Sequence, residues 1–404
     1  MTPVLYGSIK PGKLKQLCLT SALALLQIYN CSSCTTFKMT SQLLVTFGAL
    51  ADVQYADCED RPAHYNPLLC RYYREALDHV DSAFCEWERE GSVNFVLQLG
   101  DIIDGLNRND ASSHIAMKRT LARFEKYANI PTFHTVGNHE LYNFSRKELT
   151  GFFWESLSHL DVSEHILAPP DVPTCLTSPL YYTFSPVKGI KCISLDCFEV
   201  SVIGYEPSHP RYVQAAEILY SHHGHYDFDG WDCDHFLHGR NKRFQAQNGA
   251  ASEEQLDWLD KELQDSDTNG EKVILFGHVA LCPGSVDDSC LLWNYQEVMD
   301  VFHRHSSVVL YLCGHAHKSG YAVDSHGVHY LVLAGIIETS PLEQAFMTLS
   351  VYEDKIEVIG YGREHSRTLF LRPATVAPVE AEEIELSAED ITSTLSTLSV
   401  KVVV

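Results

Sequence analysis

FGALADVQYAD, residues 47–57, is an apolar run that stops at the carboxylate of Asp52, with the amide of Gln54 two positions further on. Residues 43–50 read LLVTFGAL, which is typical of a buried strand. In an extended chain, residues i and i+2 point to the same side, so we expect both side-chain oxygens to converge just beyond this strand. Two convergent oxygens indicate a cation site, although a simple turn after a strand remains the alternative for this stretch alone.

Four later strands are expected to end in a similar way, with a glycine followed by a polar side chain. The sequences are LQLGD at 97–101, HTVGNHE at 134–140, LFGH at 275–278 and YLCGHAH at 311–317. Glycine permits a tight turn and a close approach of the backbone to a bound group. Ligands of α/β proteins lie at the carboxyl ends of strands, and carboxylate, amide and imidazole all bind Mn²⁺, Zn²⁺ or Fe. Each dipeptide is common alone, but together they predict a metal centre.

Short apolar runs alternate with amphipathic segments, which predicts an α/β protein. Two helices are expected at 71–89 and 114–128, and a capping box of Ser252 and Gln255 is expected to open a third. Residues 321–361 read as several short strands with turns at 325–327 and 353–354. The buried strands are expected at 43–50, 93–99, 131–136, 189–195, 272–277 and 307–314.

Charge and cysteine content restrict the partners of the protein. The 404 residues carry a formal net charge of −23, which argues against general binding to nucleic acid or to an anionic membrane. A phosphate-bearing substrate would therefore need bridging cations. The 13 cysteines have no repeated CxxC spacing, so we expect reduced thiols in a cytoplasmic protein, and we expect a monomer.

The chain is expected to contain one domain between two atypical ends. Residues 1–38 hold lysines before LCLTSALALLQIY, and we interpret them as an extension outside the fold, with a signal peptide as the alternative. The domain then covers 39–372, and 373–404 form an acidic, disordered tail. Within the domain, 200–248 is an insertion with little periodicity, and its His-rich part, 222–238, is interpreted as a solvated or lid loop, with a further metal site as the alternative.

The ordered motifs resemble those of the calcineurin-like metallophosphoesterases, whose pattern is D-x-H, G-D-x-x-D-G, G-N-H-[ED], G-H and G-H-x-H. The resemblance runs from Val45 to His317, and Gln54 stands where that family usually has histidine. DVQYAD, GNHELYNF and SEEQLDWL look like one branch, the manganese-dependent ADP-ribose/CDP-alcohol diphosphatases. The resemblance implies a four-layer α+β fold, with two mixed β-sheets packed as a sandwich, flanking helices and a dimetal site at the strand carboxyl ends.

Carried over residue by residue, the resemblance implies a centre with two divalent cations, Mn²⁺ first and Zn²⁺ or Mg²⁺ as alternatives. Asp101 would bridge both cations through its two oxygens, and the cations would activate a water molecule between them. His139 would stabilise the transition state or protonate the leaving oxygen, and Asp104 would orient a ligand histidine. The remaining ligands would be Asp52, Gln54 and His317 at the first cation, and Asn138, His278 and His315 at the second.

The resemblance also implies hydrolysis of a nucleoside diphosphate linkage in ADP-ribose or a CDP-alcohol. The products would be a nucleoside monophosphate and a phosphorylated partner. Another phosphodiesterase or phosphomonoesterase activity is an alternative, and a binding module with a disabled centre is a second. Candidate contacts to the substrate are Asn107, Arg108, Tyr142, Asn143, Arg243 and Phe244.

Overall fold

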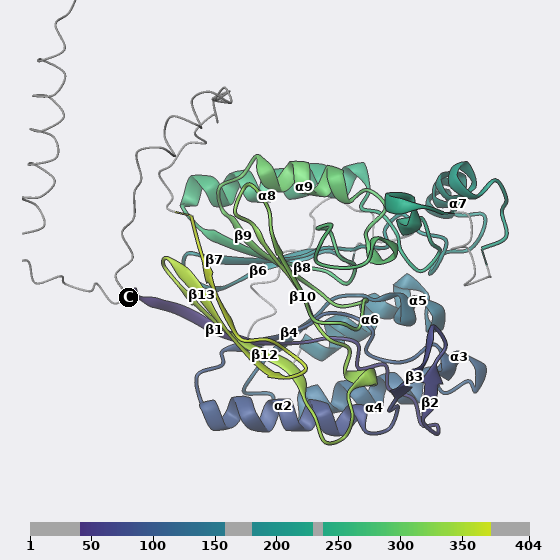
Figure 1. Cartoon of the computed structure of the whole chain (residues 1–404), viewed down its shortest axis with the longest axis horizontal. Coiled ribbons are helices and arrows are strands. Elements are labelled where there is room, and N and C mark those ends of the chain that lie inside the picture. The colour runs from purple at the N-terminus through teal and green to yellow at the C-terminus, as the bar shows by residue number, and fades with distance from the viewer. Residues whose placement is uncertain (1–40, 158–179, 229–236, 373–404) are drawn as a thin grey trace, which may run out of the picture. The chain divides into compact units, whose positions relative to one another are not determined.

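Two mixed β-sheets pack face to face, and helices cover both outer faces (Figure 1). The computed structural model describes residues 41–157, 180–228 and 237–372. The fold has the α/β sandwich architecture expected from the sequence, with α2 and α4 on one outer face and α8 and α9 on the other. The predicted N-terminal extension and acidic tail lie outside the described residues.

The first sheet has six strands in the order β14-β13-β12-β1-β4-β5. The strands β1, β4 and β5 run parallel, whereas β12 pairs with β1 antiparallel. This parallel half places the carboxyl ends of three strands at one edge, as the β-α-β-α-β order predicts. The bounds are β1 (Leu43–Leu50), β4 (Phe95–Gln98), β5 (Thr132–His134), β12 (Ala345–Tyr352), β13 (Lys355–Gly362) and β14 (Arg367–Phe370).

The second sheet also has six strands, in the order β10-β11-β9-β8-β7-β6. Its central strands β7, β8, β9 and β11 are parallel, and the outer strands β6 and β10 are antiparallel to their neighbours. The bounds are β6 (Tyr182–Val187), β7 (Ile190–Ser194), β8 (Lys272–Phe276), β9 (Val308–Cys313), β10 (Gly320–Val323) and β11 (His329–Val332). A separate hairpin is formed by β2 (Arg61–Ala63) and β3 (Asn66–Arg71).

The two helices expected at 71–89 and 114–128 are present as α2 (Ala76–Glu90) and α4 (Ser113–Glu125), and their bounds differ from the expected ones by one to five residues. α8 begins after Ser252, whose hydroxyl accepts the Gln255 N–H at 3.1 Å, but the Gln255 side chain binds Asp196 and Glu199 instead of completing the capping box. The helices are α2 (Ala76–Glu90), α3 (Leu106–Asn109), α4 (Ser113–Glu125), α5 (Asn138–Asn143), α6 (Arg146–Leu157), α7 (Pro210–His223), α8 (Glu253–Asn269) and α9 (Tyr295–His303), with 3₁₀ turns η3 (Gly239–Arg243), η4 (Asp288–Cys290) and η5 (Ile336–Glu338).

Aromatic side chains fill the space between the sheets. Phe47 of β1 stacks on Phe95 of β4 with ring centroids 5.1 Å apart, and Phe133 of β5 stacks on Phe184 of β6 at 3.6 Å. The second pair joins the two sheets, because β5 and β6 belong to different ones. Burial of one such ring contributes about 2–3 kcal/mol. The core therefore fixes the two sheets against each other.

The insertion 200–248 is more regular than predicted. It contains α7, which begins after His209 with Pro210 at its first position and ends before Gly224. Histidine is not among the residues preferred at a helix N-cap, so the sequence around His209 did not predict the start of α7. The prediction of one long loop is therefore wrong for 210–223. Part of the His-rich segment, 229–236, lies outside the described residues.

Removal of residues 1–38 is expected to leave folding and activity unchanged, because β1 begins at Leu43 and, within the described ranges, pairs with β12 and β4. Thermal unfolding and turnover of the truncated and full-length proteins provide the comparison. An insoluble or inactive truncated protein would place the domain boundary before residue 38.

Among the helices of the described ranges, we find none that is long and apolar enough to cross a membrane.

Candidate metal centre

The loops after five strands bring the predicted ligands together at one edge of the sandwich. The first sheet supplies oxygen-bearing side chains after β1, β4 and β5, and the second sheet supplies imidazoles after β8 and β9. The first group is Asp52, Gln54, Asp101 and Asn138, and the second is His278, His315 and His317.

Most of these residues hold a left-handed backbone. The φ angles are 52° at Asp52, 44° at Gln54, 55° at Asp101, 68° at His315 and 54° at His317. The extended arrangement expected for Asp52 and Gln54 is therefore wrong: β1 ends at Leu50, and the two side chains converge through a tight loop. Left-handed backbone is costly for residues with a Cβ, and such positions cluster at functional sites. Packing around the loops must hold these residues in place.

One half of the centre is formed around Gln54. Its amide nitrogen lies 2.9 Å from Asp101 Oδ2 and 3.0 Å from His317 Nε2. His317 Nε2 lies 3.5 Å from Asp52 Oδ1. These atoms come from four separate positions in the sequence and face one point. They form the first predicted cation site.

The other half is formed around Asn138 Oδ1. This oxygen lies 3.1 Å from His278 Nε2 and 3.1 Å from His315 Nδ1. His278 Nε2 is also 3.3 Å from Asp101 Oδ2. Asp101 therefore contacts both halves through the same oxygen, and not through its two oxygens as expected, because Oδ1 accepts the His139 backbone N–H at 2.9 Å.

The outer nitrogen of each histidine is already occupied, which leaves the inner nitrogen for a cation. The outer atoms are His278 Nδ1, 2.7 Å from Leu99 O; His317 Nδ1, 2.8 Å from Glu338 Oε1; and His315 Nε2, 2.7 Å from Asn248 Oδ1. All three outer nitrogens face oxygen acceptors, so in the neutral ring the proton is on the outer nitrogen and the lone pair is on the inner one. Such outer partners orient metal-binding imidazoles.

The electrostatic field favours positive charge at two of the three imidazoles, whereas burial and the neighbouring His278 lower the pKa of His315. Burial opposes protonation of His278, but the Asp101 carboxylate outweighs it and raises the pKa of His278 to about 9. Burial and Asp52 act in the same way on His317, whose pKa is also raised to about 9. Two imidazoles that bind protons this strongly mark a place where a cation is stabilised.

The amide of Gln54 provides a test of whether these residues fit a metal. Within the part of the chain that the structure describes, Gln54 Oε1 is buried and has no hydrogen-bond partner. Its amide nitrogen instead takes the place between Asp101 and His317. A 180° turn of the amide would point the oxygen at that place, and the two orientations differ only in which atom is named oxygen. The donor set therefore fits a cation there.

Two glycines allow the loops to approach this closely. A Cβ on Gly137 would lie 2.1 Å from Asp101 Oδ1, and one on Gly314 would lie 2.5 Å from Asp52 Oδ2. Both distances are far shorter than a carbon–oxygen contact permits. The glycine before each polar group is thus required by the close approach of one loop to the next.

The sequence matches a known protein family over the range that contains these ligands. Residues 45–319 match the calcineurin-like phosphoesterase family. The chain belongs to this family. The matched range contains all seven ligand positions named above and ends just after His317.

Several relatives in this family are similar over most of their length. The manganese-dependent ADP-ribose/CDP-alcohol diphosphatase of Mus musculus is 38% identical over 81% of this chain and 94% of that protein. The Homo sapiens protein of the same name is 38% identical over 82% and 94%. That of Arabidopsis thaliana is 36% identical over 80% and 96%. The crystal structure of a dimetal phosphatase from Danio rerio gives a TM-score of 0.72 at 35% identity, covering 82% of this chain and 100% of that one.

His139 lies beside the ligands, and 12% of its side chain is exposed. Its backbone N–H donates to Asp101 Oδ1 at 2.9 Å, and its Nδ1 accepts the Gly105 N–H at 2.9 Å. The proton of the neutral ring is therefore on Nε2, which lies 3.8 Å from Asp101 Oδ2. Burial opposes protonation, but the carboxylates of Asp101 and Asp104 raise the pKa of His139. This ring can hold a proton at the edge of the centre.

Asp104 was expected to orient a ligand histidine, and the structure places it elsewhere. Its Oδ2 lies 3.3 Å from Nδ1 of His139, which is not among the proposed ligands. Asp104 lies three residues after Asp101, and the turn directs it away from the cation positions. Its carboxylate acts on the proton affinity of His139.

Sequence reasoning missed four residues that support the centre. Glu140 accepts the N–H groups of Asp101 at 2.9 Å and Gly137 at 2.8 Å, which ties two ligand loops together. Glu338 binds His317 and also accepts the Tyr65 hydroxyl at 2.5 Å. The other two are Asn248, which binds His315, and Arg71, which lies between Glu338 and Asp104 at 3.5 and 3.8 Å. The fourth letter of GNHE was the only local signal.

A cavity of about 550 Å³ contains half of the predicted substrate contacts. Arg108, Tyr142 and Asn143 line it, together with insertion residues that include Tyr205 and Phe228. Tyr142 also links the cavity to the centre, because its hydroxyl accepts from the Asn138 amide at 3.2 Å.

The structure does not bring the other three predicted contacts to this cavity. The Asn107 amide is buried and donates to the carbonyl oxygens of Tyr55 and Asp104, both at 2.8 Å. Arg243 donates to Trp293 O at 2.7 Å, and Phe244 stacks on His222 with centroids 3.5 Å apart. These three side chains hold loops together. Their partners, three backbone carbonyl groups and one imidazole ring, could not be predicted from the sequence.

Proposed function

We propose that the protein hydrolyses the diphosphate linkage of ADP-ribose and of CDP-alcohols such as CDP-choline, in a manganese-dependent reaction. The products are a nucleoside monophosphate and a phosphorylated partner. The observation that carries the proposal is the complete donor set, with Gln54 included and His139 beside it. The relatives with this name share more than a third of their residues with the chain. A module with a disabled centre would lack ligands or His139.

Each residue of the centre has a defined part in this proposal. Asp52, Gln54, His317 and Asp101 hold one divalent cation, and Asn138, His278, His315 and Asp101 hold the other. A cation pair supplies Lewis-acid charge for a phosphoryl group and lowers the pKa of water. His139 donates its Nε2 proton to the leaving oxygen, and Asp104 and Asp101 raise the proton affinity of that ring.

The cavity beside the centre is proposed to hold the rest of the substrate. Arg108 is exposed and cationic, so it suits the outer phosphate or its substituent, and Asn143 offers an amide at the same wall. Tyr205 and Phe228 present aromatic surface to a base or sugar. Tyr142 lies between the two parts. The small-molecule nucleotide is therefore bound by both the GD and GNHE loops and the insertion.

A substrate panel tests the activity. Purified protein is assayed with Mn²⁺, Mg²⁺ and Zn²⁺ on ADP-ribose, CDP-choline, cyclic AMP and a phosphopeptide. We expect the two diphosphates to be cleaved fastest with Mn²⁺. Preferred cleavage of cyclic AMP or the phosphopeptide would favour another phosphoesterase activity. Absence of metal binding in a calorimetric titration would favour the non-catalytic module.

Replacing Gln54 with His is expected to tighten metal binding and to shift the preferred metal away from Mn²⁺. An amide oxygen is a weaker donor than imidazole, and oxygen-rich sites suit Mn²⁺ or Mg²⁺ whereas imidazole favours Zn²⁺. Calorimetric dissociation constants for Mn²⁺ and Zn²⁺, measured after chelation, give the comparison, and activity against each free metal is the second readout. If Gln54→His leaves both dissociation constants unchanged, Gln54 does not set the metal preference.

We also propose that the protein works as a cytoplasmic monomer. The buried thiols of Cys192, Cys197 and Cys313 are free, which suits a reducing compartment. Light scattering coupled to size-exclusion chromatography gives the oligomeric state. A mass near 91 kDa, twice the chain mass of 45.5 kDa, would contradict the monomer.

A further inference from the structure

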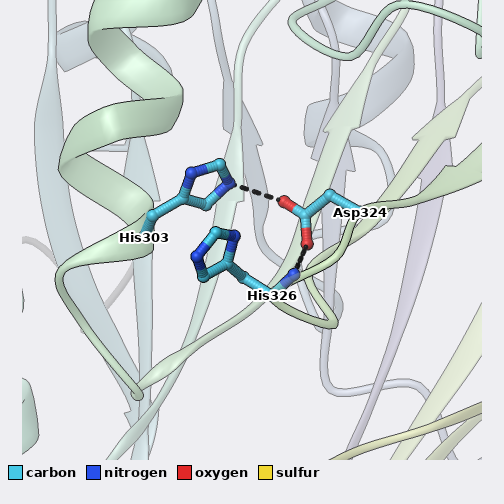
Figure 2. Close-up of side chains that lie close together, drawn as sticks. All are labelled: His303, Asp324 and His326. Carbon is cyan, nitrogen blue, oxygen red and sulfur yellow. Dashed lines mark hydrogen bonds and ion pairs between the residues drawn. The ribbon is translucent and has the colours of Figure 1, made fainter. Parts of the chain in front are cut away.

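A second group of metal-binding side chains lies at the far end of α9. His303 is the last residue of this helix, and Asp324 and His326 lie in the turn between β10 and β11 (Figure 2). One donor atom from each of the three lies within 4.8 Å of the other two. None of these residues belongs to the centre described above. No motif in the sequence indicates this group, because His303 and Asp324 are 21 positions apart.

The three side chains lie close together, with one ring stacked on the other. His303 Nε2 lies 2.9 Å from Asp324 Oδ2, and the two imidazoles stack with centroids 3.8 Å apart and planes 17° from parallel. Figure 2 shows the carboxylate facing the pair of rings. The His303 side chain is 22% exposed, that of Asp324 is 8% exposed, and His326 is an exposed residue, so the group is open to solvent on the His326 side.

The turn itself holds the carboxylate in this orientation. Asp324 Oδ1 accepts the N–H groups of His326 at 2.9 Å and Val328 at 3.0 Å, and Oδ2 accepts the Tyr330 hydroxyl at 2.9 Å. Because these donors come from the protein, Oδ2 keeps its position whether or not His303 carries a proton. A carboxylate fixed in this way presents one lone pair of Oδ2 to the imidazoles.

We propose that His303, Asp324 and His326 form a Zn²⁺-binding site that is separate from the catalytic centre. Two imidazoles and one carboxylate, with water in the fourth position, are a common donor set for tetrahedral Zn²⁺. The ion replaces the proton shared by His303 and Asp324. Tetrahedral coordination requires a nitrogen–oxygen separation of about 3.3 Å, so the His303–Asp324 pair must open by a few tenths of an ångström from 2.9 Å. The exposed His326 ring must also turn out of its stack on His303 to direct a nitrogen at the same ion.

The two sites are expected to prefer different metals, because their donor atoms differ. The catalytic centre combines oxygen donors with imidazole, which suits Mn²⁺, whereas the α9 group has two nitrogens and one oxygen, which suits Zn²⁺. A bound ion would link the end of α9 to the β10–β11 turn. Because it binds only the folded chain, it raises the free energy of unfolding with the logarithm of its concentration over its dissociation constant.

The experiment counts bound Zn²⁺ in the full-length protein. Chelator-treated wild type, His303→Ala and His326→Ala are dialysed against the same micromolar Zn²⁺, and bound metal is measured by atomic spectrometry. Wild type is expected to bind one equivalent more than either variant, and all three are expected to have the same Mn²⁺-dependent activity. His114→Ala is the matched control, because His114 also lies near one carboxylate, Glu148 at 3.6 Å, but belongs to no three-donor group among the described residues.

A spectroscopic readout separates metal binding from a structural effect of the substitutions. Co²⁺ in a tetrahedral site absorbs strongly in the visible range, and this band is expected in wild type and His114→Ala beyond the signal of His326→Ala. Equal Zn²⁺ stoichiometry and equal Co²⁺ spectra in all four proteins would overturn the proposal, and the cluster would then be a hydrogen-bonded turn only. The catalytic centre is intact in every variant, so the result does not depend on the proposed activity.

Discussion

Asp101→Asn is expected to lower kcat/KM for the best diphosphate substrate by about two orders of magnitude or more. Asp101 Oδ2 lies 2.9 Å from the Gln54 amide and 3.3 Å from His278, so one atom contacts both halves of the centre. A neutral amide of the same shape keeps the contacts but removes the negative charge that balances two cations. The measurement is steady-state turnover at several Mn²⁺ concentrations, with calorimetric Mn²⁺ binding beside it.

The control for this variant is Asp110→Asn, which removes the same charge from an exposed residue nine positions later. We expect it to keep the activity and Mn²⁺ affinity of the wild type. Thermal unfolding of both variants separates a loss of charge from a loss of structure. Near-native turnover of Asp101→Asn at subsaturating Mn²⁺ would exclude Asp101 as the bridge.

His139→Ala is expected to keep both metals but to lose about 10²–10⁴-fold in kcat, the usual contribution of a positioned acid or base. The ring contacts Asp104 and Gly105 but takes no ligand position, so its removal leaves the seven ligand side chains intact. An interaction made only in the transition state lowers kcat and kcat/KM together while Mn²⁺ affinity stays unchanged.

Metal content and turnover are measured on the same preparation of His139→Ala, with His365→Ala as an exposed control. A substrate whose leaving group needs no proton, such as a nitrophenyl ester, should lose much less activity. If the variant loses Mn²⁺ in parallel with turnover, His139 is structural. If the activated ester is affected as strongly as ADP-ribose, the ring stabilises charge and does not donate a proton.

The buried strands and the order of the site residues could be predicted from the sequence for a physical reason. Strands covered on both faces must be continuously apolar, so the runs at 43–50 and 307–314 match β1 and β9 within one residue at each end. The glycine-led loops were recognisable because close approach leaves no room for a Cβ. The two-residue spacing of Asp52 and Gln54 was informative, although the extended geometry assumed for it was wrong.

Other features depend on contacts between distant parts of the chain. Glu338 reaches His317 from the 3₁₀ turn after β11, and Asn248 reaches His315 from the end of the insertion. Neither follows a motif, because the partner is chosen by packing and not by spacing. Helix α7 was missed for a different reason, since its polar aromatic sequence shows little amphipathic pattern. Short elements such as the β2–β3 hairpin also carry too few residues to show a period.

The division of ligands between the two sheets has a consequence for the order of events in folding. Neither sheet alone carries both kinds of donor, so a chain with only one sheet formed has no complete cation site. Mn²⁺ should then bind only after the sheets have docked, late in the reaction. Added metal is expected to slow unfolding while leaving the refolding rate nearly unchanged. An interaction that is absent from the folding transition state changes the unfolding rate and not the folding rate.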